Sequence, residues 1–191
     1  MQHPFMESVA RELADRRIAT WRFEFPYMAA GRKRPDRAAV LVDSVRGAVR
    51  DAGVTAPDLP LFAGGKSLGG RMTSTAAAEA PLPGVQGIVF LGFPLHRPGD
   101  DSDARADHLS RVEVPMLFLQ GTRDRLAEID RIRRVCAALG PRSALHVVDG
   151  ADHGFSVPKR SGRTDERVRE ELADAVAEWI TRRLTNVARS G

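Results

Sequence analysis

The segment LFAGGKSLGG, residues 61–70, decides the fold, because an apolar run passes directly into a Gly-x-Ser-x-Gly pattern. The run over residues 59–65 is typical of a short strand, and the residues after Ser67 are typical of a helix. A strand that turns sharply into a helix holds its middle residue at unfavourable backbone angles, and Gly65 and Gly69 remove side chains that would clash there. The pattern therefore predicts a strand–turn–helix unit that exposes the Ser67 hydroxyl, rather than a flexible glycine loop.

The rest of the chain alternates between short apolar runs and segments with helical spacing of apolar residues. This alternation indicates βαβ units and a mainly parallel sheet with helices on both faces. Residues 88–91 (IVFL) are apolar throughout, as expected of a strand buried on both faces. We expect a single α/β domain over residues 1–191, arranged as a three-layer sandwich. Strands are expected at residues 18–25, 59–65, 87–92, 115–121 and 144–148, and helices at residues 5–16, 37–52, 128–139 and 164–184, besides the one after Ser67.

The composition excludes several classes of protein. The chain has 191 residues, 42% of them hydrophobic, which suits one globular domain. Its net charge is +4, but the 29 Lys and Arg are dispersed among 25 Asp and Glu, so we expect no nucleic-acid partner. Cys136 is the only cysteine, which excludes an internal disulfide. With no apolar run of membrane-spanning length and no secretory signal, we expect a cytoplasmic protein that does not bind membranes.

Two further reactive side chains follow later strands. Asp124 comes just after the strand expected at 115–121, and His153 lies in a loop after the strand at 144–148. The order Ser, Asp, His is that of α/β hydrolases, in which each residue sits at a strand's carboxyl end. Because a serine needs a base that is itself oriented by a carboxylate, we expect Ser67 to be the nucleophile, His153 the base and Asp124 its partner. The backbone N–H of Leu68 is the expected oxyanion donor.

The other histidines and nearby carboxylates fit these roles less well. Asp152 adjoins His153 in sequence and is therefore poorly placed to orient the His153 ring. We expect Asp152 to be a loop or cap residue. His96 follows the strand at 87–92 and is expected to line the substrate site. The remaining residues have structural expectations: Glu128 begins a helix, His146 packs in the core from within a strand, His3 and His108 lie on the surface, and Cys136, in the middle of a helix, packs in the core.

At this point the sequence resembles a small bacterial α/β-hydrolase family that is labelled dienelactone-hydrolase-like. That family is related to the testis-expressed hydrolase-like proteins and to a subunit of a histone-acetyltransferase complex. The resemblance covers essentially the whole chain and implies Ser67, Asp124 and His153 as the triad, with no metal and no organic cofactor. The segments that carry it are FEFPYM (23–28), GGKSLGGRMTS (64–74), LGFPLHRPG (91–99), LFLQGTRD (117–124) and DGADHGFSVPKRSGR (149–163).

The sequence departs from this family in two places. Dienelactone hydrolases use a cysteine nucleophile, whereas this chain has Ser67. Family members also have a strand and a His-Gly-x-Gly-like loop just before the segment that matches residues 3–6, and that loop supplies a second oxyanion donor. The sequence therefore predicts an N-terminally incomplete fold that lacks a central strand and is a poor enzyme. A mis-assigned start explains this most simply; the alternatives are a real truncation or a sheet closed up by rearrangement.

These features predict a serine hydrolase that acts on a small ester or thioester. The stretches between Ser67, Asp124 and His153 are long enough only for βα units, so no lid domain and a shallow, open site are expected. The alternative is a non-catalytic interaction module with the same fold, because a fold alone does not establish a function. A basic segment at residues 31–34 is expected to recruit anionic substrates. The expected substrate-binding residues are Tyr27, Arg32, Lys66, His96, Lys159 and Arg160.

Overall fold

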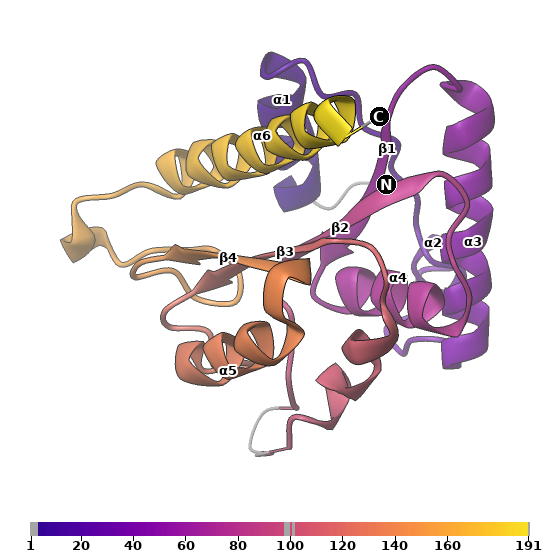
Figure 1. Ribbon diagram of the computed structural model, residues 1–191. Coiled ribbons are helices and arrows are strands. Elements are labelled where there is room, and N and C mark those ends of the chain that lie inside the picture. Colours follow the sequence, from indigo (N-terminus) through magenta and orange to yellow (C-terminus); the bar gives the residue numbers. More distant parts are fainter. Residues whose placement is uncertain (1–3, 98–99, 101, 191) are drawn as a thin grey trace.

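The centre of the molecule is a four-stranded parallel sheet with strand order β1-β2-β3-β4. The computed structural model describes residues 4–97, 100 and 102–190 (Figure 1). Each strand lies within two residues of a strand expected from the sequence, so these four predictions are confirmed. The strands are β1 (Leu61–Lys66), β2 (Val85–Leu91), β3 (Met116–Gly121) and β4 (Ser143–Val148).

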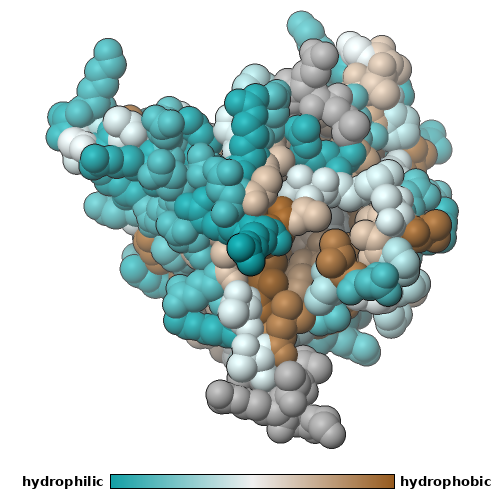
Figure 2. All heavy atoms as spheres, turned by 90° about the horizontal axis from the view of Figure 1, so that it is seen from above, coloured by the Kyte–Doolittle hydropathy of each residue, from teal (hydrophilic) through white to brown (hydrophobic). Residues whose placement is uncertain are grey.

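Helices cover both faces of the sheet and give the expected three layers (Figure 1). On one face α1 (Pro4–Asp15) packs against α6 (Asp165–Ser190). Viewed from that side, the surface is mostly hydrophilic, with hydrophobic side chains showing mainly near its middle and to the right (Figure 2). The opposite face carries α3 (Ala38–Thr55), α4 (Leu68–Glu79) and α5 (Ile129–Leu139). The shorter helices are α2 (Pro26–Ala29), η1 (Ala104–Arg111), η2 (Gly140–Arg142) and η3 (Lys159–Ser161).

The strand β3 shows why the central runs are apolar throughout. Met116 and Phe118 point into the core beneath α3, α4 and α5, whereas Leu117 and Leu119 point into the core beneath α1 and α6. All four side chains are buried. Successive residues of a strand face opposite sides of a sheet, so a sheet covered on both faces needs apolar residues at every position.

The strand expected at residues 18–25 is absent, and this prediction is wrong. The segment is irregular, and β1 lies at one edge of the sheet. Trp21 is 52% exposed and Phe23 38% exposed, although Phe25 is buried in the core. Residues with high β propensity form a strand only when a neighbouring strand satisfies their backbone N–H and C=O groups. Among the described residues, no backbone hydrogen bond joins this segment to β1.

Candidate active site

The turn between β1 and α4 has the strained geometry that the Gly-x-Ser-x-Gly pattern predicts. Ser67 has φ 51° and ψ −116°, a combination that side-chain-bearing residues rarely adopt. Its N–H donates to the carbonyl of Leu91 on β2, over 3.1 Å. A Cβ atom on Gly70 would lie 2.7 Å from the carbonyl oxygen of Gly65, so only glycine allows the helix to approach the strand this closely. Backbone packing therefore holds Ser67 in its unusual conformation.

The three residues singled out in the sequence form one chain of hydrogen bonds. The Ser67 hydroxyl oxygen lies 2.9 Å from Nε2 of His153, and Nδ1 of the same ring lies 2.7 Å from Oδ2 of Asp124. Both distances are within hydrogen-bonding range. Asp124 and His153 follow β3 and β4, and the parallel register brings the ends of these strands together at Gly121 and Val148. The sheet therefore delivers all three side chains to one edge.

The carboxylate of Asp124 is buried, and protein groups donate hydrogen bonds to both of its oxygen atoms. Only 4% of the residue is exposed. Its Oδ2 accepts a second hydrogen bond from Nε2 of Gln120, over 2.6 Å, and its Oδ1 accepts one from the backbone N–H of Leu126, over 2.8 Å. These donors replace the water that a buried carboxylate loses. They also prevent the carboxylate from rotating away from His153.

Gln120 belongs to the candidate site, and the sequence did not point to it. It is completely buried, and its Oε1 accepts the backbone N–H of Phe93 over 3.0 Å. Gln120 therefore links Asp124 to the loop after β2. The available signal was a polar side chain in a strand whose other side chains are all apolar, because a buried amide requires partners at both of its polar atoms.

Asp152, the residue before His153, holds the His153 loop in place through hydrogen bonds to its backbone. The Oδ1 atom of Asp152 accepts the backbone N–H groups of Gly154 and Ser156 over 2.8 and 3.0 Å. Asp152 is thus a loop residue, as expected, and it makes no described hydrogen bond to the His153 ring. On the other side, a Cβ on Gly121 would lie 2.2 Å from the carbonyl oxygen of Ala151. The loop therefore packs directly on the end of β3.

Lys66, the residue before Ser67, supports the same loop. Its Nζ donates to the carbonyl of His153 over 2.8 Å and lies 4.4 and 5.1 Å from the ring centres of Phe5 and Phe155. Burial lowers the pKa of Lys66 to about 8, although the charges of Asp124 and Asp152 oppose this change. The ammonium is therefore held between a carbonyl and two aromatic faces, where a cation interacts favourably.

Replacing Lys66 with methionine is expected to lower kcat for ester hydrolysis about tenfold, because it removes one charge-assisted hydrogen bond to the His153 loop. The wild-type rate should decline above about pH 8, as the ammonium that holds the loop loses its proton. Lys66→Arg keeps the charge and should lack this decline near pH 8. A pH profile of kcat for the three proteins tests this, and an unchanged profile for Lys66→Met would contradict it.

The other expected site residues lie in varied positions. Leu68 is the first residue of α4, so its N–H has no acceptor within the helix. His96 is buried within the loop after β2, and its pKa is raised by the carbonyl of Arg97 and the carboxylate of Glu128. Arg32 forms an exposed ion pair with Asp36. In addition, Tyr27 stacks on Phe25, and Lys159 and Arg160 lie exposed in η3.

Two histidines differ from their expectations. His146 does not pack in the core: its side chain is 34% exposed and binds Glu171 on α6 over 2.8 Å, because β4 is an edge strand. His108 is not a surface residue: its ring contacts the Ser74 hydroxyl at 2.8 Å, and burial followed by the charges of Arg71 and Arg111 lowers its pKa to about 4. By contrast, Cys136 packs against the core as expected, Glu128 precedes α5, and His3 lies outside the described residues.

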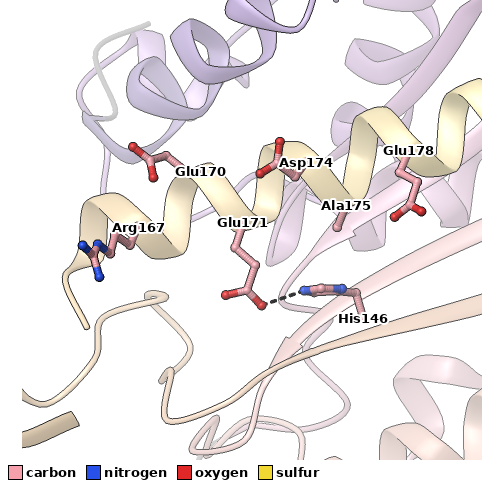
Figure 3. A pocket seen from close by; sticks show the side chains of 7 residues that line it. All are labelled: His146, Arg167, Glu170, Glu171, Asp174, Ala175 and Glu178. Atoms are coloured by element: carbon pink, nitrogen blue, oxygen red, sulfur yellow. Dashed lines mark hydrogen bonds and ion pairs between the residues drawn. The ribbon is translucent and has the colours of Figure 1, made fainter. Parts of the chain in front are cut away.

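Two hollows of the surface have linings that do not include Ser67. One, of about 360 Å³, lies between His146 on β4 and the acidic face of α6 (Figure 3). Another, of about 350 Å³, is lined by residues 77–82, 85, 111, 113 and 114. Within the described part of the chain, no three His, Cys, Asp or Glu side chains are grouped to hold a metal ion. No helix among these residues combines the length and apolar character needed to cross a bilayer.

Comparison with known proteins agrees with this architecture. A family model for α/β hydrolase domains matches residues 1–181, and the chain belongs to this family. Similar solved structures include an α/β serine hydrolase homologue from Coxiella burnetii (19% identity, TM-score 0.71, 92% of this chain and 77% of that one). A second is a serine hydrolase without a lid from Xanthomonas campestris (22% identity, TM-score 0.70, 94% of this chain and 75% of that one). A third is the esterase domain of a Rhodothermus marinus protein (17% identity, TM-score 0.68, 93% of this chain and 80% of that one). At these identities the likeness shows the fold alone.

Proposed function

We propose that this protein is a serine hydrolase that cleaves a small ester or thioester through an acyl-enzyme intermediate. The observation that carries the proposal is the continuous hydrogen-bonded chain from the Ser67 hydroxyl through His153 to the buried carboxylate of Asp124. Nucleophile, base and orienting group are each within the reach that this chemistry requires. The strained backbone at Ser67 adds support, because strain of this kind persists where it positions a reacting group.

In the first half of the reaction, Oγ of Ser67 forms a bond to the substrate's carbonyl carbon while Nε2 of His153 takes the hydroxyl proton. The carbonyl electron pair moves onto its oxygen, which accepts a hydrogen bond from the N–H of Leu68 at the positive end of α4. Asp124 stabilises the imidazolium and fixes its orientation. Collapse of the intermediate breaks the bond to the alcohol or thiol, which leaves with the proton from His153.

Water completes the reaction by the same route. His153 removes a proton from water as its oxygen bonds to the acyl carbon, and the bond to Oγ then breaks with return of the proton to Ser67. The acid is released and the resting enzyme is restored. The names of the structural neighbours from Coxiella burnetii and Rhodothermus marinus, a serine hydrolase homologue and an esterase domain, are consistent with this class of reaction.

A fluorophosphonate probe tests the proposal directly. We expect the full chain to be labelled on Ser67 and to hydrolyse p-nitrophenyl esters of short acids, because the probe reacts only with a serine that a neighbouring base activates. Tryptic mass spectrometry identifies the labelled peptide. A folded protein that is neither labelled nor active would contradict the proposal and favour the non-catalytic interaction module.

A further inference from the structure

Three arginines are brought together on the α4 side of the sheet. Arg71 is one helical turn beyond Ser67, and its N–H donates to the Ser67 carbonyl over 3.1 Å. Arg97 lies in the loop after β2. The first residue of this loop, Gly92, lies against the His153 ring. Arg105, on η1, donates through its guanidinium to the carbonyl of His96 over 2.8 Å, so it is held beside Arg97. The helix η1 in turn packs against α4.

The positive charges of these arginines affect one another. Burial lowers the pKa of Arg71, and the charges of Arg105 and Arg97 lower it further. The pKa of Arg105 is lowered by burial and then by Arg97, with Asp100 opposing the change. Among the described residues, none of the three forms an ion pair with a carboxylate, whereas Arg16 and Arg32 do.

Arg71 also has an unsatisfied donor. Its Nε atom is buried and has no hydrogen-bond partner in the described structure. The adjacent His108 adds no further positive charge, because its ring is neutral near pH 7. The positive guanidinium groups repel one another, and a buried N–H without an acceptor lowers the stability of the fold. Both costs are relieved when an anion with several oxygen atoms binds between the guanidinium groups.

We propose that Arg71, Arg97 and Arg105 form a binding site for an anionic group, a carboxylate or a phosphate, on the substrate that Ser67 attacks. This proposal rests on the proposed hydrolase function and specifies its substrate class. Guanidinium groups match the planar geometry of carboxylate and phosphate oxygens, which favours these anions. Because Arg71 is one helical turn, about 5.4 Å of rise, beyond Ser67, a linker of a few atoms should separate the anion from the reacting carbonyl.

This site differs from the one expected from sequence. The segment at residues 31–34 is rich in positive charge, but Arg32 is exposed and already paired with Asp36. The three arginines proposed here come from α4, from the loop after β2 and from η1. An exposed and already paired cation has little capacity to bind a further anion. By contrast, Arg71 and Arg105 are partly buried and Arg97 is exposed, and none of the three has a carboxylate partner among the described residues.

Two esters of equal chain length test the site: p-nitrophenyl pentanoate and mono-p-nitrophenyl glutarate, which differ by a terminal carboxylate. In the wild type we expect the higher kcat/KM for the glutarate ester. Arg71→Met and Arg105→Met should each lower the ratio of kcat/KM, glutarate to pentanoate, by about tenfold or more. The matched control is Arg134→Met, at an exposed arginine of α5, which should leave the ratio unchanged. A ratio unchanged in both site variants would overturn the proposal.

Calorimetric binding of glutarate and of inorganic phosphate separates this proposal from the hydrolase function, since it needs no reaction at Ser67. Binding to wild type that Arg71→Met weakens supports the site even if neither ester is hydrolysed, and the tighter of the two anions identifies the preferred group. Hydrolysis of both esters without anion binding would overturn the site and leave the hydrolase function standing. Melting temperatures establish that each variant is folded.

Discussion

Replacing Ser67 with alanine is expected to lower the kcat for p-nitrophenyl ester hydrolysis by roughly 10⁴- to 10⁶-fold. The hydroxyl is the group that lies 2.9 Å from Nε2 of His153, and no other hydroxyl is described in hydrogen-bond contact with that ring. Without it, no acyl-enzyme can form at this position. The measurement is kcat at saturating ester, together with fluorophosphonate labelling, which should disappear completely.

The strained backbone provides a control for this variant. Ser67→Gly should be equally inactive, yet more stable than Ser67→Ala by about 1 kcal/mol or more, because glycine adopts a φ of 51° without steric cost. Thermal melting of the two variants measures this difference. Substantial ester hydrolysis by both variants would show that Ser67 is not the nucleophile.

Asp124→Asn is expected to lower kcat by roughly 10⁴-fold. Every hydrogen-bond partner described for this carboxylate is a donor: Oδ2 faces His153 and Gln120, and Oδ1 faces the N–H of Leu126. An asparagine presents an NH₂ group at one of these positions, where it meets another N–H. The His153 ring then loses the partner that fixes its orientation, or the backbone N–H of Leu126 loses its acceptor.

The matched control is Asp152→Asn, the same chemical change one residue before His153. Asparagine keeps an oxygen that can accept the N–H groups of Gly154 and Ser156, so we expect less than about a tenfold loss of kcat. Steady-state kinetics of both variants, with melting temperatures, decide the matter. Equal losses in the two variants would mean that the loop's conformation matters and that Asp124 has no special role.

The elements nearest to Ser67 were predictable because their determinants are local. The glycines that allow the turn are within three residues of Ser67, and the strand and helix on either side are encoded by adjacent residues. The grouping of Asp124 and His153 beside Ser67 was predictable for another reason. The carboxyl ends of parallel strands lie at a common edge, so three residues that each follow a strand were expected to converge.

Residues 18–25 could not be assigned correctly from sequence. Their alternation of apolar and polar residues is typical of a strand, yet strand formation depends on a hydrogen-bonded partner elsewhere in the chain. The expectation that His146 packs in the core was wrong for a related reason. A histidine within a strand is buried in the middle of a sheet and partly exposed at its edge, and strand order alone decides which applies.

The sequence by itself determined the class of fold and the three residues of the hydrogen-bonded chain, because spacing along one chain specifies turns, helices and the succession of strands along the chain. Only the tertiary structure decided how Gln120 holds the carboxylate of Asp124, and that Arg71, Arg97 and Arg105 lie together. These arrangements join side chains from different elements. Their interaction energies depend on the distances between the groups, and those distances are set only after the elements have packed.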